Sequence, residues 1–569
     1  MGYGLRRKLA EGYTGADFRA DLRAGAAVAA VSLPLSLALA VAAGVAPQHG
    51  LYTAIVAGVV VALLGGTRVQ ITGPTAAFVV ILLPILHRYG LAGLLTAGMM
   101  AGVLLIAMGL ARFGKLFTLI PHPVTTGFTA GIALVLALLQ LKDVLGVVVP
   151  TSDGLIGYLD GLWAARGQVS LPDLGVAVVT VGLLVLVPRL DRRLPAPLLV
   201  LAVVAAAVAL IHQLAPSFAP VTIAHRFQSA IDGQVVHGLP PLPPMPMWPW
   251  DPPSSSTQFA LDYATIRALL PSALAIALLG AIESLATATV ADGVSPPGVS
   301  RHEPNAELIA LGVGNLVCPF FGGIPCTGAL ARTATNIRAG ARSPLASAFH
   351  AVIVLACMLA LAPLVSYLPM AALAGLLLVV ARNLSEARHF ARLMRIAPRA
   401  DVGVLLTCFG LTVVFDMVVA VTVGVVMAAL LFMRRMTVLT RVTLEHDDPI
   451  HHVVPEGVRV FQIAGPMFFG AAKTAMATLE VTDQATRTIV LNMKHVPTID
   501  ATGLVALEST LDRLRRDKRM VVLAGLQPDM QAILERADIK RVPGELAFAP
   551  DLDTAVSMAI VHAAHAPTG

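Results

Sequence analysis

The sequence contains GGTRVQITGPTAAF at residues 65–78 and FFGGIPCTGALART at residues 320–333, two apolar stretches broken by glycine and proline. In each stretch these residues come directly before a short helical segment, which we expect to begin at Thr75 in the first and at Thr327 in the second. Interrupted hydrophobic segments at corresponding places in two halves of a chain are typical of membrane proteins built from inverted repeats. The pair therefore predicts an α-helical membrane protein with two related halves. The alternative is that glycine and proline only kink ordinary spanning helices.

The composition also predicts a membrane protein. Of the 569 residues, 56% are hydrophobic and 13% are charged, whereas soluble domains average about 25% charged residues. A soluble fold cannot cover this much apolar surface, but a lipid bilayer removes that requirement. The net charge of +6 is explained by basic loops rather than by nucleic-acid binding. We interpret the four cysteines as buried small hydrophobic residues, not as a disulfide or metal framework: Cys318, Cys326, Cys357 and Cys408.

Apolar segments follow one another through residues 23–435, which we assign to a transmembrane domain after a cytoplasmic N-terminal segment at residues 1–22. At about 20 residues per span, this length accommodates about fourteen spans, arranged as two inverted repeats of seven. The two broken segments are then the third and tenth spans, which are equivalent positions. The predicted spans are 24–43, 51–66, 74–87, 91–111, 123–141, 171–188, 195–214, 266–290, 305–318, 327–338, 344–366, 370–382, 401–414 and 417–433.

The distribution of basic residues orients these spans. Basic residues gather in every second loop, most densely between residues 382 and 399, where five arginines occur. Because cytoplasmic loops collect arginine and lysine, this alternation predicts that both termini are cytoplasmic. The proline-rich stretch LPPLPPMPMWPWDPP (239–253) predicts an extended connector on the outer face.

Residues 436–569 differ from the rest and are predicted to form a linker and a separate cytoplasmic α/β domain. Strand-like segments at 458–464, 486–494 and 519–526 alternate with amphipathic helical segments at 502–519 and 527–537. These strands are too short to span a bilayer, and the alternation is typical of an α/β fold.

The two broken segments predict an anion site in the middle of the membrane. A helix that begins there leaves its first backbone N–H groups without partners, and these donors and the helix dipole favour an anion. The glycines let a ligand approach the backbone closely. Thr75 and Thr327 are expected either to donate hydroxyls to the substrate or only to cap their helices. The candidate binding residues are Gly73, Pro74, Thr75, Ala76, Pro325, Cys326, Thr327, Gly328 and Arg332.

A charged residue inside a predicted span marks a second feature of the site. Glu283, in LLGAIESLATATVAD (278–292), is expensive in a bilayer and is usually functional at such a place. Thr287 lies one turn later, and together they are candidates to bind a proton or a cation beside the anion. The alternative for Glu283 is a structural hydrogen bond to a neighbouring helix. Arg332 is a candidate to neutralise the anion, or else an arginine that extends to the membrane interface.

Asp500 and Thr502 are candidate regulatory residues of the C-terminal domain. They lie in HVPTIDATGLVALEST (495–510), where a strand passes into a helix. A hydroxyl at a helix N-terminus is a possible phosphate acceptor, although a helix cap explains the same residues. The sequence carries no P-loop or dinucleotide fingerprint, so we predict neither a cofactor, nor a resident metal, nor primary active transport.

Taken together, these motifs resemble the sulfate permease (SulP) family, the bacterial relatives of solute carrier family 26. The resemblance rests on PLSLALAVAAGVAPQHGLYTAIVAG (34–58), ITGPTAAF (71–78), GAIES (280–284) and FFGGIPCTGALARTATNIRAGARSPLA (320–346). The C-terminal segment resembles the STAS domain of that family, with DATG at residues 500–503. The resemblance implies a core domain and a gate domain, elevator-like anion transport and a homodimer.

Within the family, the chain is most similar to the bacterial aerobic C4-dicarboxylate transporters, on FDMVVAVTVGVVMAALLFMRR (415–435), GPTAAFVVIL (73–82) and LGAIES (279–284). This similarity implies proton-coupled uptake of succinate or fumarate across the bacterial inner membrane. Proton- or sodium-coupled sulfate or bicarbonate transport is the alternative, as is a membrane receptor that signals through its STAS domain. The implied partners are the anion, a coupling ion, membrane lipid and cytoplasmic proteins. Some members carry a glutamate where this chain has Leu35, so coupling here must use another group.

Overall fold

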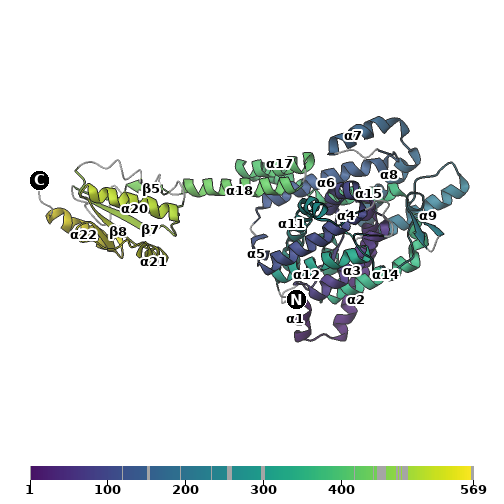
Figure 1. Cartoon of the computed structure of the whole chain (residues 1–569), viewed down its shortest axis with the longest axis horizontal. Helices are drawn as coiled ribbons and strands as arrows, with labels where there is room; N and C mark the ends of the chain where they lie inside the picture. Colours follow the sequence, from purple (N-terminus) through teal and green to yellow (C-terminus); the bar gives the residue numbers. More distant parts are fainter. Residues whose placement is uncertain are drawn as a thin grey trace. The chain divides into compact units, whose positions relative to one another are not determined.

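We describe a computed structural model of the chain. It describes residues 2–117, 120–149, 154–191, 194–231, 234–252, 259–295, 301–415, 417–439, 441–444, 457–468, 472, 476 and 485–565. The chain divides into two compact units, Met1–Val425 and Val426–Gly569 (Figure 1).

The first unit is helical. Its elements are α1 (Tyr3–Glu11), α2 (Gly15–Ala42), α3 (Pro47–Leu64), β1 (Thr72–Gly73), α4 (Ala76–Leu110), α5 (Gly114–Phe117), α6 (His122–Val144), α7 (Gly154–Ala164), η1 (Ala165–Gln168), α8 (Leu171–Leu190), α9 (Ala196–Leu214), α10 (Ile223–Arg226), β2 (Gln228–Ile231), β3 (Gln234–His237), α11 (Tyr263–Val294), α12 (Pro304–Val317), η2 (Cys318–Phe321), β4 (Thr327–Gly328), α13 (Leu330–Arg338), α14 (Leu345–Ser366), α15 (Met370–Leu384), α16 (Ala387–Ile396) and α17 (Arg399–Val414), followed by α18 (Met417–Leu439) across the division.

Each predicted span overlaps one of these helices, and the fold class is confirmed. Within the described residues, nine helices are long and apolar enough to cross a membrane. The spans predicted at 305–318, 327–338 and 401–414 form shorter helices: α12, α13 and α17. The spans predicted at 74–87 and 91–111 join in the single helix α4, which is broken at Gly90 (φ 67°). Glycine permits this break because it lacks the Cβ atom that makes positive φ costly.

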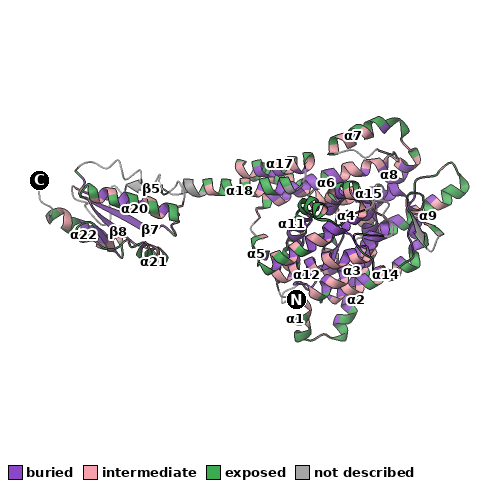
Figure 2. Cartoon of the chain, viewed as in Figure 1, coloured by how far each residue is buried: buried purple, intermediate pink, exposed green. Residues whose placement is uncertain are grey.

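The outer helices expose apolar side chains in a manner typical of contact with lipid. Only 28% of the apolar stretch of α8 and 22% of that of α9 are buried in the protein. Val178, Leu186, Val203 and Leu210 are all exposed on these helices (Figure 2). Such surfaces would aggregate in water, so the bilayer is the solvent that fits them.

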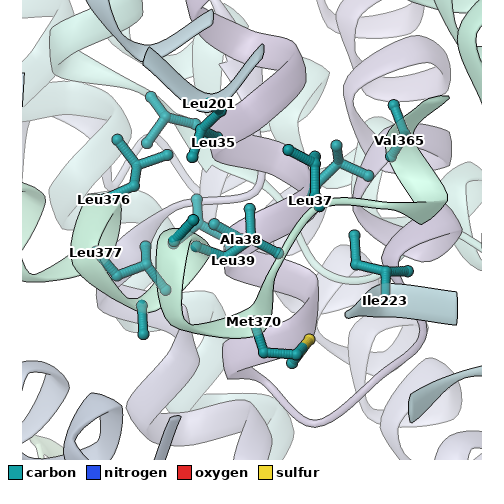
Figure 3. Close-up of a cluster of buried hydrophobic side chains, with 14 of the residues drawn as sticks. Leu35, Leu37, Ala38, Leu39, Leu201, Ile223, Val365, Met370, Leu376 and Leu377 are labelled. Carbon is teal, nitrogen blue, oxygen red and sulfur yellow. The ribbon is translucent and has the colours of Figure 1, made fainter. Parts of the chain in front are cut away.

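An extensive apolar core lies where α2 meets helices from distant parts of the chain. Leu35, Leu37 and Leu39 of α2 pack with residues of α9, α10, α14 and α15 (Figure 3). Leu37 and Leu376 are almost fully buried. This core holds α2 against α15 next to the candidate site described below.

The N-terminal segment packs against the first unit. Gly2 and Gly4 donate backbone hydrogen bonds to the carbonyls of Leu64 and Gly65 at the end of α3. Helix α2 already begins at Gly15, capped by Thr14, which is earlier than the domain boundary expected at residue 23. The capping box of Thr14 and Asp17 supplies the start signal.

The second unit contains a five-stranded α/β sheet in the order β5 (Arg441–Leu444), β6 (Val458–Ala464), β7 (Thr488–His495), β8 (Met520–Ala524) and β9 (Leu546–Ala549). Strand β5 pairs antiparallel with β6, and the other pairs are parallel. One apolar cluster joins the sheet to α20 (Ala501–Arg516) and α21 (Pro528–Arg536), and another joins it to α22 (Leu552–His565). The predicted strands and helices are all present, together with β5, β9 and α22.

Candidate functional site

The two broken segments meet in the interior of the first unit. Strands β1 and β4 pair antiparallel, with Thr72 opposite Gly328 and Gly73 opposite Thr327. The backbone N–H of Ala329 also donates to the carbonyl of Ile71 at 2.8 Å. These two segments, about 250 residues apart in the sequence, therefore lie side by side, as expected for equivalent segments of two inverted repeats.

Each strand leads into a helix, but the two helices begin differently. Helix α4 begins at Ala76 with Thr75 at its N-cap, as predicted. Helix α13 begins at Leu330 with Ala329 at its N-cap, so the expected start at Thr327 is wrong. The reason is that Thr327 and Gly328 are used in the strand pairing with β1, and helix geometry can begin only after that pairing ends.

Both helix ends offer backbone donors to a ligand. Among the described residues, neither Thr75 nor Ala329 caps its helix through a side chain. The first N–H groups of α4 and α13 have no acceptor within their own helices, and both helix dipoles are positive at these ends. The strand pairing places these two ends in one region, where they favour an anion.

Glu283 of α11 lies at the first of these helix ends. Its carboxylate accepts a hydrogen bond from the Thr75 hydroxyl at 2.9 Å. Thr75 is buried, whereas Glu283 keeps partial exposure. The carboxylate therefore contacts the N-cap of α4 directly without being completely enclosed.

Arg332 lies in the first turn of α13 and is almost completely buried, with 2% of its surface exposed. A position at the membrane interface does not fit this burial. Its Nη1 atom has no hydrogen-bond partner among the described residues, and its charge interacts with that of Glu283. A Cβ atom on Gly73 would lie 2.4 Å from Nη1, so only glycine at this position leaves the guanidinium in place. Arg332 is therefore a buried guanidinium with one N–H group left to donate, which is the chemistry expected of an anion ligand.

The hydroxyls of Thr287 and Thr327 make backbone contacts instead of lining the site as free donors. Thr287 Oγ1 donates to the carbonyl of Gly328 at 3.2 Å, and Thr327 Oγ1 donates to the carbonyl of Gly280 at 2.9 Å. Both bonds join α11 to β4. The Thr287 hydroxyl oxygen keeps its lone pairs while its proton is donated to Gly328, so its joint role with Glu283 in binding a proton or a cation stays a prediction.

Pro325 and Cys326, just before β4, and Gly328, within it, are closely packed. Asn315 of α12 exchanges two hydrogen bonds of 2.9 Å with the backbone of Cys326, so that N–H is not available to a substrate. Pro325 packs against Gly98, and a Cβ on Gly328 would lie 2.3 Å from Gln70 Nε2. Of the other candidates, Gly73 and Pro74 are buried and Ala76 is partly buried.

The sequence reasoning missed Glu307, a fully buried carboxylate on α12. It accepts hydrogen bonds from the backbone N–H groups of Gly66 (2.9 Å) and Thr67 (3.2 Å) and from Gln70 Nε2 (2.9 Å). It therefore holds the chain that leads into β1. The available signal was an acidic residue inside the span predicted at 305–318.

In the C-terminal unit, Asp500 is the N-cap of α20 and accepts a hydrogen bond from the Gly503 N–H at 2.7 Å. Thr502 is exposed in the first turn. The capping alternative therefore accounts for Asp500, and the exposure of Thr502 is compatible with modification. Within the described ranges, no group of three or more His, Cys, Asp or Glu side chains is arranged to hold a metal.

Comparison with known proteins assigns this architecture. Residues 18–408 match the sulfate permease family, and residues 450–555 match the STAS domain. The chain belongs to the sulfate permease family. It is accordingly a multi-pass membrane protein and an anion transporter of that family, with a C-terminal STAS domain, and it is not an enzyme.

Relatives support this assignment over nearly the whole permease. It is 35% identical to the putative sulfate transporter YvdB of Bacillus subtilis, over 95% of this chain and 97% of that protein. It is 31% identical to the bicarbonate transporter BicA of Picosynechococcus, over 88% of this chain and 87% of that protein.

Solved structures agree with the fold of this permease. The transmembrane domain of a cyanobacterial BicA matches with a TM-score of 0.60 at 27% identity, covering 73% of this chain and 98% of that one. The murine anion transporter Slc26a9 in its inward-facing state matches with a TM-score of 0.83 at 18% identity, covering 97% of this chain and 93% of that one.

Proposed function

We propose that this permease imports a small inorganic oxyanion by secondary active transport, with Glu283 as the group that binds the coupling proton. One observation carries the proposal. The Glu283 carboxylate is bonded to the N-cap of α4 and interacts with the buried guanidinium of Arg332, at the point where two helix N-termini converge.

The geometry explains why an anion and a proton would move together. In the empty site the charges of Glu283 and Arg332 balance each other. An anion drawn to Arg332 and the helix ends is repelled by the Glu283 carboxylate, and protonation of Glu283 removes that repulsion. Each ligand therefore favours binding of the other, which is the reciprocity that symport requires.

The substrate is the least constrained part of the proposal. The relatives reported above are named for sulfate and bicarbonate, and these names favour the inorganic oxyanions over the C4-dicarboxylates expected from the motifs. A tetrahedral or planar oxyanion also suits a site made of one guanidinium and two clusters of backbone N–H groups. We place sulfate first and bicarbonate second.

The proposal includes a cellular setting. The alternating loop charges support an orientation in the bacterial inner membrane with both termini cytoplasmic. The permease forms a homodimer and moves its substrate by an elevator-like motion. Its STAS domain binds cytoplasmic proteins. The STAS domain regulates transport without lining the anion site, because every residue of that site described above lies in the first unit.

Uptake by purified protein in proteoliposomes tests the function. We would measure accumulation of radiolabelled sulfate, bicarbonate and succinate while imposing a proton gradient and a sodium gradient separately. We expect sulfate accumulation driven by an inward proton gradient, with no competition by fumarate. Uptake that depends only on the sodium gradient would show that sodium, and not a proton, is the coupling ion. Anion flux that is independent of both gradients would identify an uncoupled exchanger or channel. The complete absence of anion flux would favour the alternative of a membrane receptor that signals through its STAS domain.

A further inference from the structure

A pocket in the first unit lies away from the site described above. It has a volume of about 200 Å³, and its described lining includes Val41, Leu83, His87, Lys142, Arg226 and Phe227. These residues come from four helices or their ends: α2, α4, α6 and α10.

The pocket lies at one end of the first half of α4. That helix begins at Ala76 in the candidate anion site and reaches His87 before it breaks at Gly90. At 1.5 Å per residue, the eleven intervening steps span roughly 16 Å, about half the thickness of the hydrocarbon layer. The pocket is therefore at the membrane surface toward which α4 runs from the site.

The pocket also lies between two groups of helices. Helices α2 and α4 pack with the elements that build the anion site, whereas α6 packs mainly on α15 and α17. A space between these two groups is where a path from the membrane surface to the anion site would begin.

The pocket carries an excess of positive charge. Among the described residues, no carboxylate is found in its lining. Arg226 is paired with Asp143, but the ammonium of Lys142 has no ion-pair partner in the described part of the chain and retains partial exposure. His87 lies within electrostatic reach of Lys142 and lines the same pocket.

We propose that this pocket recruits the anion before transport: it is a surface site for small inorganic oxyanions, with Lys142 as its principal charge. This inference rests on the proposed function, because the site feeds the transport centre. A cation at the mouth of a narrow path raises the local anion concentration and the rate of encounter, and the effect weakens with salt. In the proposed orientation, the pocket faces the outside of the cell.

Thiol chemistry tests the pocket without requiring transport. We would place a cysteine at Leu83, a lining position without charge, in a background with Cys357→Ser; the other three native cysteines are buried. Intact cells are then treated with an anionic (sulfonatoethyl) or a cationic (trimethylammonioethyl) methanethiosulfonate, neither of which crosses the membrane. After normalisation to a free thiol, we expect the anionic probe to react about five-fold faster than the cationic one, because a unit charge about 8 Å away in water attracts one and repels the other by about 0.5 kcal/mol each.

Matched variants assign the effect to the pocket. Lys142→Gln should abolish most of the preference and Lys142→Arg should preserve it. Arg166→Gln removes an exposed positive charge from the connection between α7 and α8 and should change nothing. Added sulfate should slow the reaction at Leu83→Cys. Equal rates for the two probes, or a preference unchanged by Lys142→Gln, would overturn the proposal.

Uptake kinetics separate this inference from the proposed function. If the wild-type protein transports sulfate, Lys142→Gln should raise KM several-fold at low ionic strength and leave kcat within about two-fold, with the difference shrinking at high ionic strength. An unchanged KM would contradict a recruiting role. If the wild-type protein transports nothing, the proposed function fails, and the thiol experiment still decides whether the pocket attracts anions.

Discussion

The two broken segments of the membrane unit begin alike and end in different chemistry. In the first, the helix starts directly at the N-cap Thr75, whose hydroxyl donates to Glu283. In the second, the helix starts later, Thr327 donates to a backbone carbonyl, and a buried guanidinium occupies the first turn. Two equivalent positions thus share an architecture but differ in chemistry: the first segment contacts the carboxylate that we propose binds the coupling proton, and the second carries the buried positive charge.

The strongest test of this division removes the charge from the second segment. Arg332→Gln should reduce anion uptake by about a hundred-fold or more, because the loss of a buried charged ligand costs about 3 kcal/mol or more. Radiolabelled uptake in proteoliposomes measures the effect. Arg338→Gln, at the exposed end of the same helix, is the matched control and should transport normally. If Arg332→Gln retains most of the activity in folded protein, the guanidinium does not bind the anion.

The next test removes the charge that the first segment contacts. Glu283→Gln keeps the shape and can still accept the Thr75 hydroxyl, but it cannot be protonated in the relevant pH range. We expect loss of accumulation driven by a proton gradient, while exchange of labelled for unlabelled anion continues at a rate within about ten-fold. Glu386→Gln, at an exposed site, is the control. Normal accumulation against a gradient would make Glu283 a structural residue only.

A third test asks whether the two segments must meet closely. Gly73→Ala places a methyl group 2.4 Å from Arg332 Nη1, so the guanidinium must move or the strand must shift. Such overpacking typically costs about 1–3 kcal/mol, and we expect uptake to fall about ten-fold through a higher KM. Gly175→Ala, at a helical site with open space around it, should be silent. Wild-type kinetics for both variants would show that Arg332 tolerates displacement.

Replacing each of the two threonines by alanine compares the two segments through smaller expected effects. Thr75→Ala removes the donor to Glu283 and should alter the pH dependence of uptake. Thr327→Ala removes a hydroxyl bonded to the backbone of α11 and should lower stability by about 1 kcal/mol with an unchanged pH profile. Thermal unfolding and uptake across a pH series measure both quantities. Identical pH profiles in the two variants would remove the functional distinction between the segments.

The smallest effect is expected outside the membrane unit altogether. A chain ending at residue 444 lacks the STAS domain but keeps every residue of the anion site. Its affinity for sulfate, measured by equilibrium binding to stable purified protein, should lie within about two-fold of the full-length value, although rate and assembly change. Loss of binding by a folded truncated protein would place part of the anion site in the STAS domain.

The positions of most helices, and the residues that are unusual within them, could be read from the amino-acid sequence. Hydropathy and composition are local properties, so α2, α3, α6 and α14 could be located without knowing what they pack against. The glycine and proline before Thr75 and the carboxylate of Glu283 stand out in the sequence itself. Each of these residue types is energetically unfavourable within an apolar spanning segment, so its presence there indicates a structural or functional role.

Which of these residues contact one another depends on how the helices pack. The pairing of Gly73 with Thr327 shifted the start of α13 to Leu330, and no local signal marks that pairing. Packing of α12 brings Glu307 to the backbone N–H groups of Gly66 and Thr67, before β1, and the carboxylate accepts hydrogen bonds from both. Packing of α11 against β4 likewise brings the Thr287 hydroxyl to the carbonyl of Gly328. Hydrogen-bond partners depend on distances between segments remote in sequence, and those distances exist only once the helices have packed.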